Sequence, residues 1–278
     1  MNAHSIFDKA LRSESLTKEE ALFLYEKATL SDLIFIANEI RKTLHPDNTV
    51  GWIIDRNVNI TNVCMSQCLF CNFCRTKNDA DAYITSIEQY QQKIDELFLL
   101  GGNQLLLQGG MHPDLGLGFY VDLFKALKDL YPSLKLHALG PPEIVYIARR
   151  EKMSYRAILE TLIESGLDSL PGAGAEILSD RVRRIISPAK CSSQEWLDVM
   201  REAHRLNLPT SATMMFGHIE THEERIEHLL KIREVQDERS EGTYGFLSFI
   251  PWPFQSVGTR LSKKYHLDNF ITKNDYLR

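Results

Sequence analysis

The chain has 278 residues, of which 44% are hydrophobic and 25% are charged, which is enough to bury a single large core. Its 32 Lys and Arg against 37 Asp and Glu give a net charge of -5 without a basic block, so we expect no nucleic-acid partner. The charged N-terminus and the lack of a long apolar run argue against a signal peptide and a membrane span. We therefore expect a cytoplasmic protein with no membrane partner.

The N-terminal region predicts helices. Residues 1–50 are expected to form an N-terminal helical extension, and residues 51–278 the core that follows it. The Pro-, Asn- and Gly-containing segment 45–57 is expected to connect the helices to a first strand, VNITNV at 58–63. The chain ends on FITKNDYLR, which has the pattern of another helix opening at Thr272 and Asn274, so we expect the C-terminal part of the core to be incomplete.

Short apolar runs recur along the rest of the chain, each followed by turn residues and a segment of helical period. They are NQLLLQ (103–108), LKLHAL (134–139), LDSL (167–170), TSATMMF (210–216) and GFLSFI (245–250). Capping-box pairs begin several of the intervening helices, at Ser86, Ser192 and Thr221. Strands that alternate with helices predict a parallel sheet of the α/β class. About six βα units favour a closed or partly closed (βα) barrel over an open sheet.

Four of the five cysteines lie in CMSQCLFCNFC, residues 64–74, directly after the first predicted strand, where the mouth of a barrel begins. An odd number of closely spaced cysteines does not form a disulfide framework, and such thiolates bind zinc or iron–sulfur instead. Two spacings overlap, C-x3-C-x2-C from Cys64 and C-x2-C-x2-C from Cys68. A non-catalytic iron–sulfur or zinc-binding module is therefore one hypothesis, although the remote Cys191 is followed by Ser192 and not by the Pro of a ferredoxin motif.

The C-x3-C-x2-C spacing, with an aromatic residue before its third cysteine, resembles the radical S-adenosylmethionine superfamily. The resemblance implies a partial TIM barrel of six βα units and a 4Fe-4S cluster held by Cys64, Cys68 and Cys71, next to Phe70. It also implies that the open iron of the cluster binds S-adenosylmethionine, which an electron cleaves to a 5′-deoxyadenosyl radical. Cys74 is then interpreted as a small residue that packs beside the loop.

Several longer stretches between about residues 45 and 260 are similar to the cyclic dehypoxanthinyl futalosine synthase family of menaquinone biosynthesis. They are DRNVNITNVCMSQCLFCNFCR, LLQGGMHPDL, HALGPPEI, GLDSLPGAGAEILSDRVRRIISPAK, EWLDVMREAH, TSATMMFGHIETHEERIEHLLKIREVQDE and FIPWPFQ. This resemblance implies hydrogen abstraction from the ribose of dehypoxanthine futalosine and cyclisation onto its benzoate ring, with a flavodoxin or ferredoxin as electron donor. The aminofutalosine synthase family shares several of the stretches, and Trp252 and Gln255 favour the cyclase.

The resemblance implies further cofactor-binding residues. Gln108, Gly109 and Gly110 close the second strand at the position of the superfamily's methionine-binding motif, where glycines allow close approach to the backbone. Glu176 is expected to accept hydrogen bonds from a ribose or from the cofactor's ammonium. Arg183 is expected either to pair with the methionine carboxylate or to lie on a solvated helix face.

Other candidates lie near the ends of later strands. His218, with Glu220, follows the fifth strand and is expected to be catalytic, as the proton acceptor when aromaticity is restored. His137 on the third strand is expected to contact substrate or to be a satisfied structural residue. Trp252 and Gln255, just past the sixth strand, are expected to enclose the aromatic half of the substrate or simply to pack.

Overall fold

A computed structural model describes residues 3–47, 49–267 and 271–278. Its strands are β1 (Asp55–Asn59), β2 (Gln104–Gln108), β3 (Lys135–Ala138), β4 (Leu167–Ser169), β5 (Thr210–Phe216) and β6 (Phe246–Pro253). The helices are α1 (Ala3–Leu11), α2 (Lys18–Lys27), α3 (Leu30–Leu44), α4 (Ile87–Leu99), α5 (Leu117–Leu130), α6 (Pro141–Glu151), α7 (Tyr155–Glu164), α8 (Asp180–Ile186), α9 (Ser193–Arg205), α10 (His222–Asp237), α11 (Arg260–Tyr265) and α12 (Lys273–Leu277). Within these ranges no helix has the length and apolarity that a membrane crossing needs.

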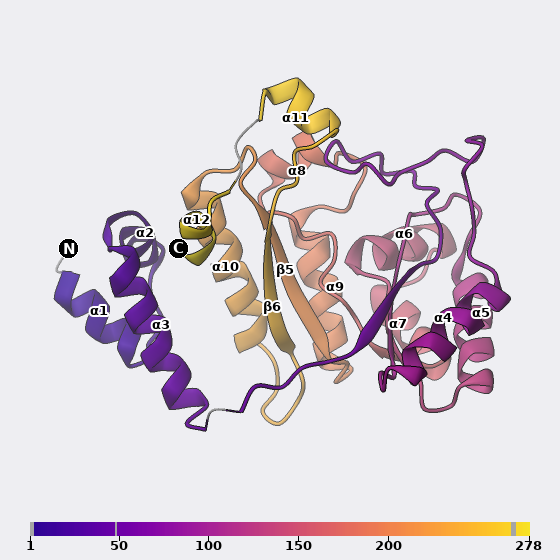
Figure 1. Cartoon of the computed structure of the whole chain (residues 1–278), viewed down its shortest axis with the longest axis horizontal. Helices are drawn as coiled ribbons and strands as arrows, with labels where there is room; N and C mark the ends of the chain where they lie inside the picture. Colours follow the sequence, from indigo (N-terminus) through magenta and orange to yellow (C-terminus); the bar gives the residue numbers. More distant parts are fainter. Residues whose placement is uncertain (1–2, 48, 268–270) are drawn as a thin grey trace.

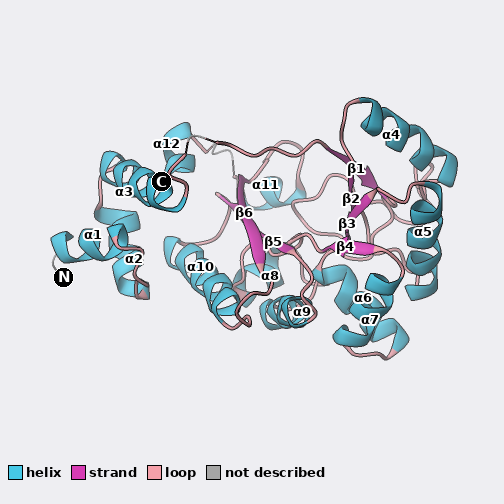
Figure 2. Ribbon diagram, turned by 90° about the horizontal axis from the view of Figure 1, so that it is seen from below, coloured by secondary structure: helices cyan, strands magenta, loops and turns pink. Residues whose placement is uncertain are grey.

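The strands form an arc around a concave interior. β1, β2, β3 and β4 pair in that order and β5 pairs with β6, all parallel. A bridge between Leu170 and Thr210 joins the two sheets, because Leu170 donates to Pro209 O at 2.9 Å and accepts from Ser211 N at 3.2 Å. Seen from below, the arc is open between β6 and β1 (Figure 2). The prediction of a partly closed barrel with six parallel strands is confirmed.

β1 and β6 differ from the prediction by more than one residue at an end. β1 begins at Asp55 and pairs with Gln104 onward, so the prediction of a strand at 58–63 was wrong at both ends. Past Asn59 the chain turns into the cysteine-bearing loop, where Arg75 N donates to Asn62 O at 2.8 Å and Cys64 N donates to Arg75 O at 3.0 Å. β6 continues to Pro253, so Trp252 lies within the strand and not beyond it.

The main core lies between the strands and the helices that cover their convex side (Figure 2). Leu105, Leu107 and Leu136 are fully buried there, together with Trp196 of α9. The three predicted capping boxes are confirmed at the starts of α4, α9 and α10, where each N-cap hydroxyl accepts the N–H of the third helical residue. These helices therefore begin where local sequence dictates, and apolar burial fixes them on the sheet.

α1, α2 and α3 pack around an apolar cluster of their own, which includes Ile6, Leu24 and Ile36. They stand beside α10 on the outside of the barrel (Figure 1). Lys18 links the two groups through Glu223 at 2.5 Å and Glu227 at 2.6 Å. A domain boundary at residue 50 stays a prediction.

Candidate functional site

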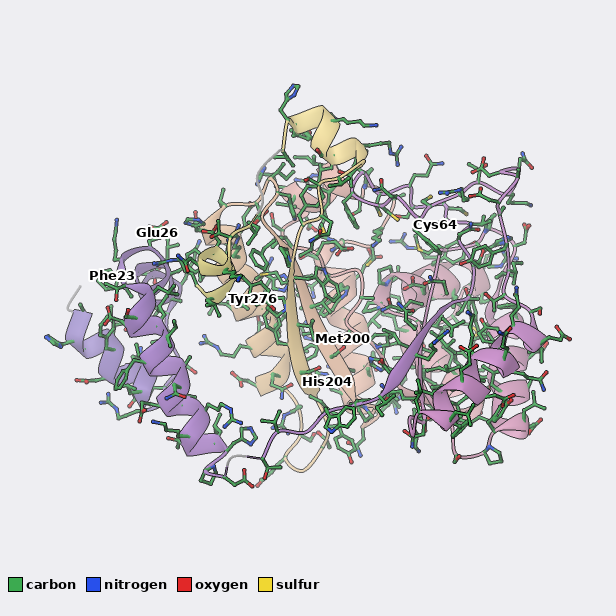
Figure 3. All side chains as sticks on the ribbon, viewed as in Figure 1. Phe23, Glu26, Cys64, Met200, His204 and Tyr276 are labelled. Atoms are coloured by element: carbon green, nitrogen blue, oxygen red, sulfur yellow. The ribbon has the colours of Figure 1, made fainter. Side chains whose placement is uncertain are left out.

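The cysteine-bearing loop lies at the carboxyl ends of the strands, where barrels place their chemistry. The loop comprises residues 64–74 and follows β1, which ends at Asn59. Cys64 lies at the end of the molecule that carries α8 and α11 (Figures 1 and 3). His204 lies toward the opposite end of the strands (Figure 3). The loop is fixed to α8 by a hydrogen bond from Leu69 N to Ile186 O, 2.8 Å long.

The thiols of this loop are held by nearby hydrogen-bond donors. Cys64 Sγ accepts the N–H groups of Ser66 and Met111, both at 3.4 Å, and Cys68 Sγ lies 3.0 Å from Ser66 Oγ. Burial raises the pKa of Cys64 to about 11 and also raises the pKa of Cys68. Coordination to a metal would deprotonate these thiols, and N–H groups directed at sulfur stabilise the resulting thiolates.

The donor set fits a cluster better than a single ion. Within the described ranges, no three His, Cys, Asp or Glu side chains are arranged to hold one metal ion. A 4Fe-4S cluster places each thiolate on a different iron, so its cysteines need not converge on one point. Cys74 turns away from this set, because its Sγ donates to Cys64 O at 3.2 Å. That geometry supports the interpretation of Cys74 as a residue that packs beside the loop.

Gly109 and Gly110 bring the end of β2 directly against the cysteine-bearing loop. A Cβ on Gly110 would lie 2.1 Å from Val63 O, and one on Gly109 would lie 3.0 Å from Thr61 O. Only glycine permits this approach, which positions the next residue, Met111, to donate its N–H to Cys64 Sγ. The loop itself therefore explains these glycines, and their contact with a cofactor stays a prediction.

Lys190, which the sequence reasoning missed, lies at the centre of the site. Its Nζ is 2.8 Å from Glu176 Oε1 and 5.4 Å from the centre of the Phe70 ring. Burial acts to raise the pKa of Glu176, but the charge and hydrogen bond of Lys190 outweigh it and lower that pKa. Burial also opposes the charge on Lys190, yet Glu176 and Cys68 together raise the pKa of the ammonium. A fixed cation therefore lies beside a predicted cluster ligand.

Glu143 is a second residue that the sequence reasoning missed. It lies in the first turn of α6, directly after β3, and burial raises its pKa to about 7. Its Oε2 has neither exposed surface nor a hydrogen-bond partner among the described residues. An unpaired buried carboxylate oxygen is costly unless a donor reaches it, and a ligand ammonium is such a donor. The signal was its place after a strand end, the same rule that indicated Glu176.

Arg183 does not take either of its expected roles. It is 3% exposed, so it is not on a solvated helix face. Nε and Nη2 donate to Cys191 O at 3.0 and 2.6 Å, and Nη1 donates to the carbonyls of Gly174 and Ala175 at 3.0 and 2.6 Å. The remaining Nη2 hydrogen faces Cys191 Sγ at 3.6 Å. All five donors are satisfied internally, so pairing with a methionine carboxylate was a wrong prediction.

His218 and Glu220 lie in the turn after β5, and a catalytic role for them stays a prediction. His218 has no exposed side-chain surface; its Nε2 donates to Met215 O at 3.0 Å and its Nδ1 accepts from Ile219 N at 2.8 Å. Burial lowers the pKa of His218, although the Glu220 carboxylate, 3.1 Å from Nδ1, acts in the opposite direction. Glu220 accepts from Gly217 N at 2.6 Å and from Arg225 Nε at 2.8 Å. The pair fixes the turn after β5, because its polar atoms all bond within the protein.

The concave face of the first sheet is polar. In one row across the strands, Asn57 lies beside Leu106, His137 and Ser169, and none of the four is fully buried. His137 Nδ1 is 2.7 Å from Ser169 Oγ, and burial lowers the pKa of His137. Nearer the mouth, Gln108 lies beside Asn59. Such a face can form hydrogen bonds with a polar ligand inside the arc.

Trp252 and Gln255 lie on the β6 side of the arc. Trp252 is 39% exposed beside Met215, and Gln255 follows the strand end, exposed, with its Nε2 donating to Pro253 O at 3.2 Å. Substrate contact by His137, Trp252 and Gln255 stays a prediction.

A family model described as the radical SAM superfamily matches residues 58–232, a segment that contains the cysteine-bearing loop, the glycine pair and the Lys190 cluster. The chain belongs to the radical SAM superfamily. This superfamily uses a 4Fe-4S cluster and S-adenosylmethionine, which confirms the cofactor prediction at the level of the family. The fold agrees, since the crystal structure of HydG, a maturase of the [FeFe]-hydrogenase, matches with a TM-score of 0.69 at 16% identity, over 91% of this chain and 54% of HydG.

Three curated relatives of this radical SAM chain carry different names. It is 40% identical to 5-amino-6-(D-ribitylamino)uracil–L-tyrosine 4-hydroxyphenyl transferase 1 of Methanosarcina mazei, over 93% of this chain and 66% of the relative. It is 36% identical to cyclic dehypoxanthine futalosine synthase of Halalkalibacterium halodurans, over 100% of this chain and 73% of the relative. It is 37% identical to aminodeoxyfutalosine synthase of Thermus thermophilus, over 98% of this chain and 72% of the relative. The chain thus spans about two thirds to three quarters of the length of these relatives.

Proposed function

We propose that this chain is the catalytic barrel of a radical SAM enzyme that cyclises dehypoxanthine futalosine. The observation that carries the proposal is the similarity of the chain, over 100% of its length and at 36% identity, to a cyclic dehypoxanthine futalosine synthase. When bound, the cluster and S-adenosylmethionine supply a 5′-deoxyadenosyl radical. The remaining chemistry is a matter of position and exclusion of water.

The residues of the barrel have distinct roles in this proposal. Cys64, Cys68 and Cys71 hold the cluster, and the unpaired oxygen of Glu143 receives the ammonium of S-adenosylmethionine. Asn59 and Gln108 lie side by side at the ends of β1 and β2. Their side-chain amides would donate hydrogen bonds to the ribose of the substrate and accept hydrogen bonds from it. Trp252 on β6 would cover its benzoate ring, and a redox protein such as flavodoxin or ferredoxin would supply the electron.

A second candidate is a 4-hydroxyphenyl transfer between L-tyrosine and 5-amino-6-(D-ribitylamino)uracil, because the Methanosarcina mazei transferase is 40% identical. That substrate pair also combines a polyhydroxylated chain with a phenol ring, so the polar concave face would serve both reactions. The two activities differ in the ligands that they require, and substrate assays separate them.

The test is anaerobic reconstitution with iron and sulfide, followed by reduction with S-adenosylmethionine present. We expect a brown 4Fe-4S chromophore, 5′-deoxyadenosine, and a cyclised product by mass spectrometry when dehypoxanthine futalosine is added. A tyrosine–ribitylaminouracil adduct, or aminofutalosine from its own precursor, would replace the specific assignment with that of the sibling enzyme. A chain without 5′-deoxyadenosine formation would contradict a radical SAM activity altogether.

Cysteine variants test the ligand assignment in the same preparation. Cys74→Ser is expected to keep a full complement of iron and sulfide, because its Sγ bonds to a carbonyl of the loop. Cys64→Ser is expected to lose the cluster. If Cys74→Ser loses it instead, the ligands follow the spacing that starts at Cys68.

A further inference from the structure

We propose that α11, with the adjoining end of α8, forms a basic docking surface for an acidic one-electron carrier protein that reduces the cluster. The inference rests on the proposed function, because it requires a cluster in the cysteine-bearing loop. It goes beyond that function by naming the surface that receives the electron and the charge of the partner that binds there.

The first observation is that α11 lies directly on the cysteine-bearing loop, far along the chain from it. Leu261 N donates to Leu69 O at 2.8 Å, and Arg260 Nη2 lies 3.4 Å from Cys68 O. Asn72 Nδ2 donates to the carbonyl of Val257, just before the helix, at 2.9 Å. α8 and α11 stand together at the mouth of the barrel (Figure 1), where Leu261 packs with Ile186. A protein bound on this surface would therefore reach the loop that holds the cluster.

The second observation is the charge of this surface. Arg184 of α8 and Arg260, Lys263 and Lys264 of α11 are all exposed. None of the four forms an ion pair with a carboxylate in the part of the chain that the structure describes. The segments 64–74, 181–191 and 254–267, which meet here, contain no Asp or Glu. In a chain of net charge -5, these four cations lie on two helices at the end of the barrel that carries the cysteine-bearing loop.

The surface also has an apolar part that suits protein contact. Val257 is 75% exposed and Phe73 is 39% exposed, on either side of the Asn72 contact. Protein interfaces combine an apolar centre with a charged rim that steers the partner, and complementary charge raises association rates by tenfold or more. An acidic carrier would therefore orient with its redox group toward the loop.

The redox step is a single electron transfer. The reduced carrier, such as a flavodoxin or a ferredoxin, loses one electron and the cluster held by the cysteines gains it, passing from the 2+ to the 1+ state. No atom is exchanged. Small reductants need no docking surface, so they separate the intrinsic redox chemistry of the cluster from recognition of the carrier.

The experiment uses the reconstituted full chain, a recombinant acidic flavodoxin as the probe, and a charge-reversed variant, Lys263→Glu/Lys264→Glu. The matched control is Lys27→Glu/Lys42→Glu, which changes the same charge on exposed lysines in the last turns of α2 and α3. Stopped-flow absorbance follows cluster reduction by flavodoxin at several salt concentrations, and biolayer interferometry follows binding of oxidised flavodoxin. Photoreduced deazaflavin serves as the small reductant.

At low salt, we expect flavodoxin to bind Lys263→Glu/Lys264→Glu at least tenfold more slowly than it binds the parent. We also expect it to reduce the cluster of this variant at least tenfold more slowly. Both differences should vanish at high salt. Both variants should accept electrons from deazaflavin at the parent rate. Equal binding and reduction by flavodoxin in the two variants would overturn the docking surface while leaving the proposed function intact. The docking surface would also be overturned if the chain bound an RNA oligonucleotide more tightly than flavodoxin and the charge reversal left reduction by flavodoxin unchanged. Failure of the parent chain to assemble a reducible cluster would contradict both proposals.

Discussion

At the scale of the residue, the site depends on groups whose surroundings leave little freedom. Gly110 is fixed by a backbone contact, Lys190 by a carboxylate and a ring, and Arg183 by carbonyls on two segments. The contact that fixes each side chain or backbone position differs in kind, so substitutions at these positions are expected to have different effects.

Gly110→Ala is expected to displace the cysteine-bearing loop, because the new Cβ would lie 2.1 Å from the backbone oxygen of Val63. Overpacking of this kind costs about 1–3 kcal/mol of unfolding free energy. Gly51→Ala is the control, since a Cβ there meets nothing within 4 Å. Urea unfolding and iron content after reconstitution measure the effect. Normal iron binding in Gly110→Ala would show that the loop tolerates the shift.

Lys190→Met is expected to leave the buried Glu176 carboxylate unpaired and to lower the unfolding free energy by about 3 kcal/mol. In the parent, the pKa of Glu176 is lower in the folded chain than in the unfolded chain. Its contribution to the unfolding free energy is therefore fully present above the ordinary carboxyl pKa, and it is lost as the pH falls through the pKa of the folded chain. Without Lys190, burial should raise that pKa, and the variant should become more stable as the pH falls toward the ordinary value. Lys190→Arg keeps the charge and should keep the parent profile. Parallel pH profiles for parent and Lys190→Met would refute the pairing.

At the scale of the element, apolar patterning located the strands well where both faces are buried. TSATMMF was predicted as a strand and forms β5, which is buried along its full length. The start of β1 was missed because its first residues are polar: Asp55 and Asn57 share the concave face of the strand, and Arg56 on the opposite face pairs with Glu96 of α4 at 2.9 Å. Such a segment does not resemble a strand of a buried parallel sheet. The helix starts were found because capping chemistry is local.

His228 of α10 makes the stability of the fold depend on pH. His228 is fully buried, its Nδ1 accepts from Leu178 N at 3.0 Å, and burial lowers its pKa to about 3. Between that value and the ordinary pKa of about 6.5, the unfolded chain binds a proton that the folded chain does not. The stability therefore rises with pH across this window. His228→Gln should reduce the slope of unfolding free energy against pH by about one proton, measured by urea titrations between pH 4 and 7. An unchanged slope would mean that His228 is already protonated in the fold.

At the scale of the whole molecule, Arg225 connects the N-terminal helices with the turn after β5 at the mouth of the barrel. Arg225 of α10 donates to Glu220 at 2.8 Å and to Tyr25 Oη of α2 at 2.6 Å, and its guanidinium lies over the Phe216 ring. The helices and the turn after β5 thus share a partner. On the other side of the barrel the arc is open, and Leu247 and Trp252 of β6 are exposed beside that opening.

Arg225→Met is expected to lower the unfolding free energy by about 3 kcal/mol, because Glu220 has no exposed side-chain surface and would lose the guanidinium that pairs with it. Lys18→Met removes a partly exposed link between the same two groups of helices and should lower the unfolding free energy by less than Arg225→Met does. Chemical denaturation followed by circular dichroism compares them. Equal losses in the two variants would show that burial does not determine the strength of these links.

The sequence by itself determined the alternation of strands and helices and the helix starts, because these follow from periodicity and local capping along the chain. Its motifs also resembled the family to which the chain belongs, whereas the cysteine ligands stay a prediction. Only the tertiary structure decided which polar residues are free for chemistry. His218, Glu220 and Arg183 carry the right groups near the right strand ends, yet their hydrogen bonds are satisfied inside the protein. Lys190 and Glu143 gain their importance from partners and burial contributed by other segments. The physical reason is that the state of a polar group depends on contacts between residues distant in sequence, which spacing cannot report.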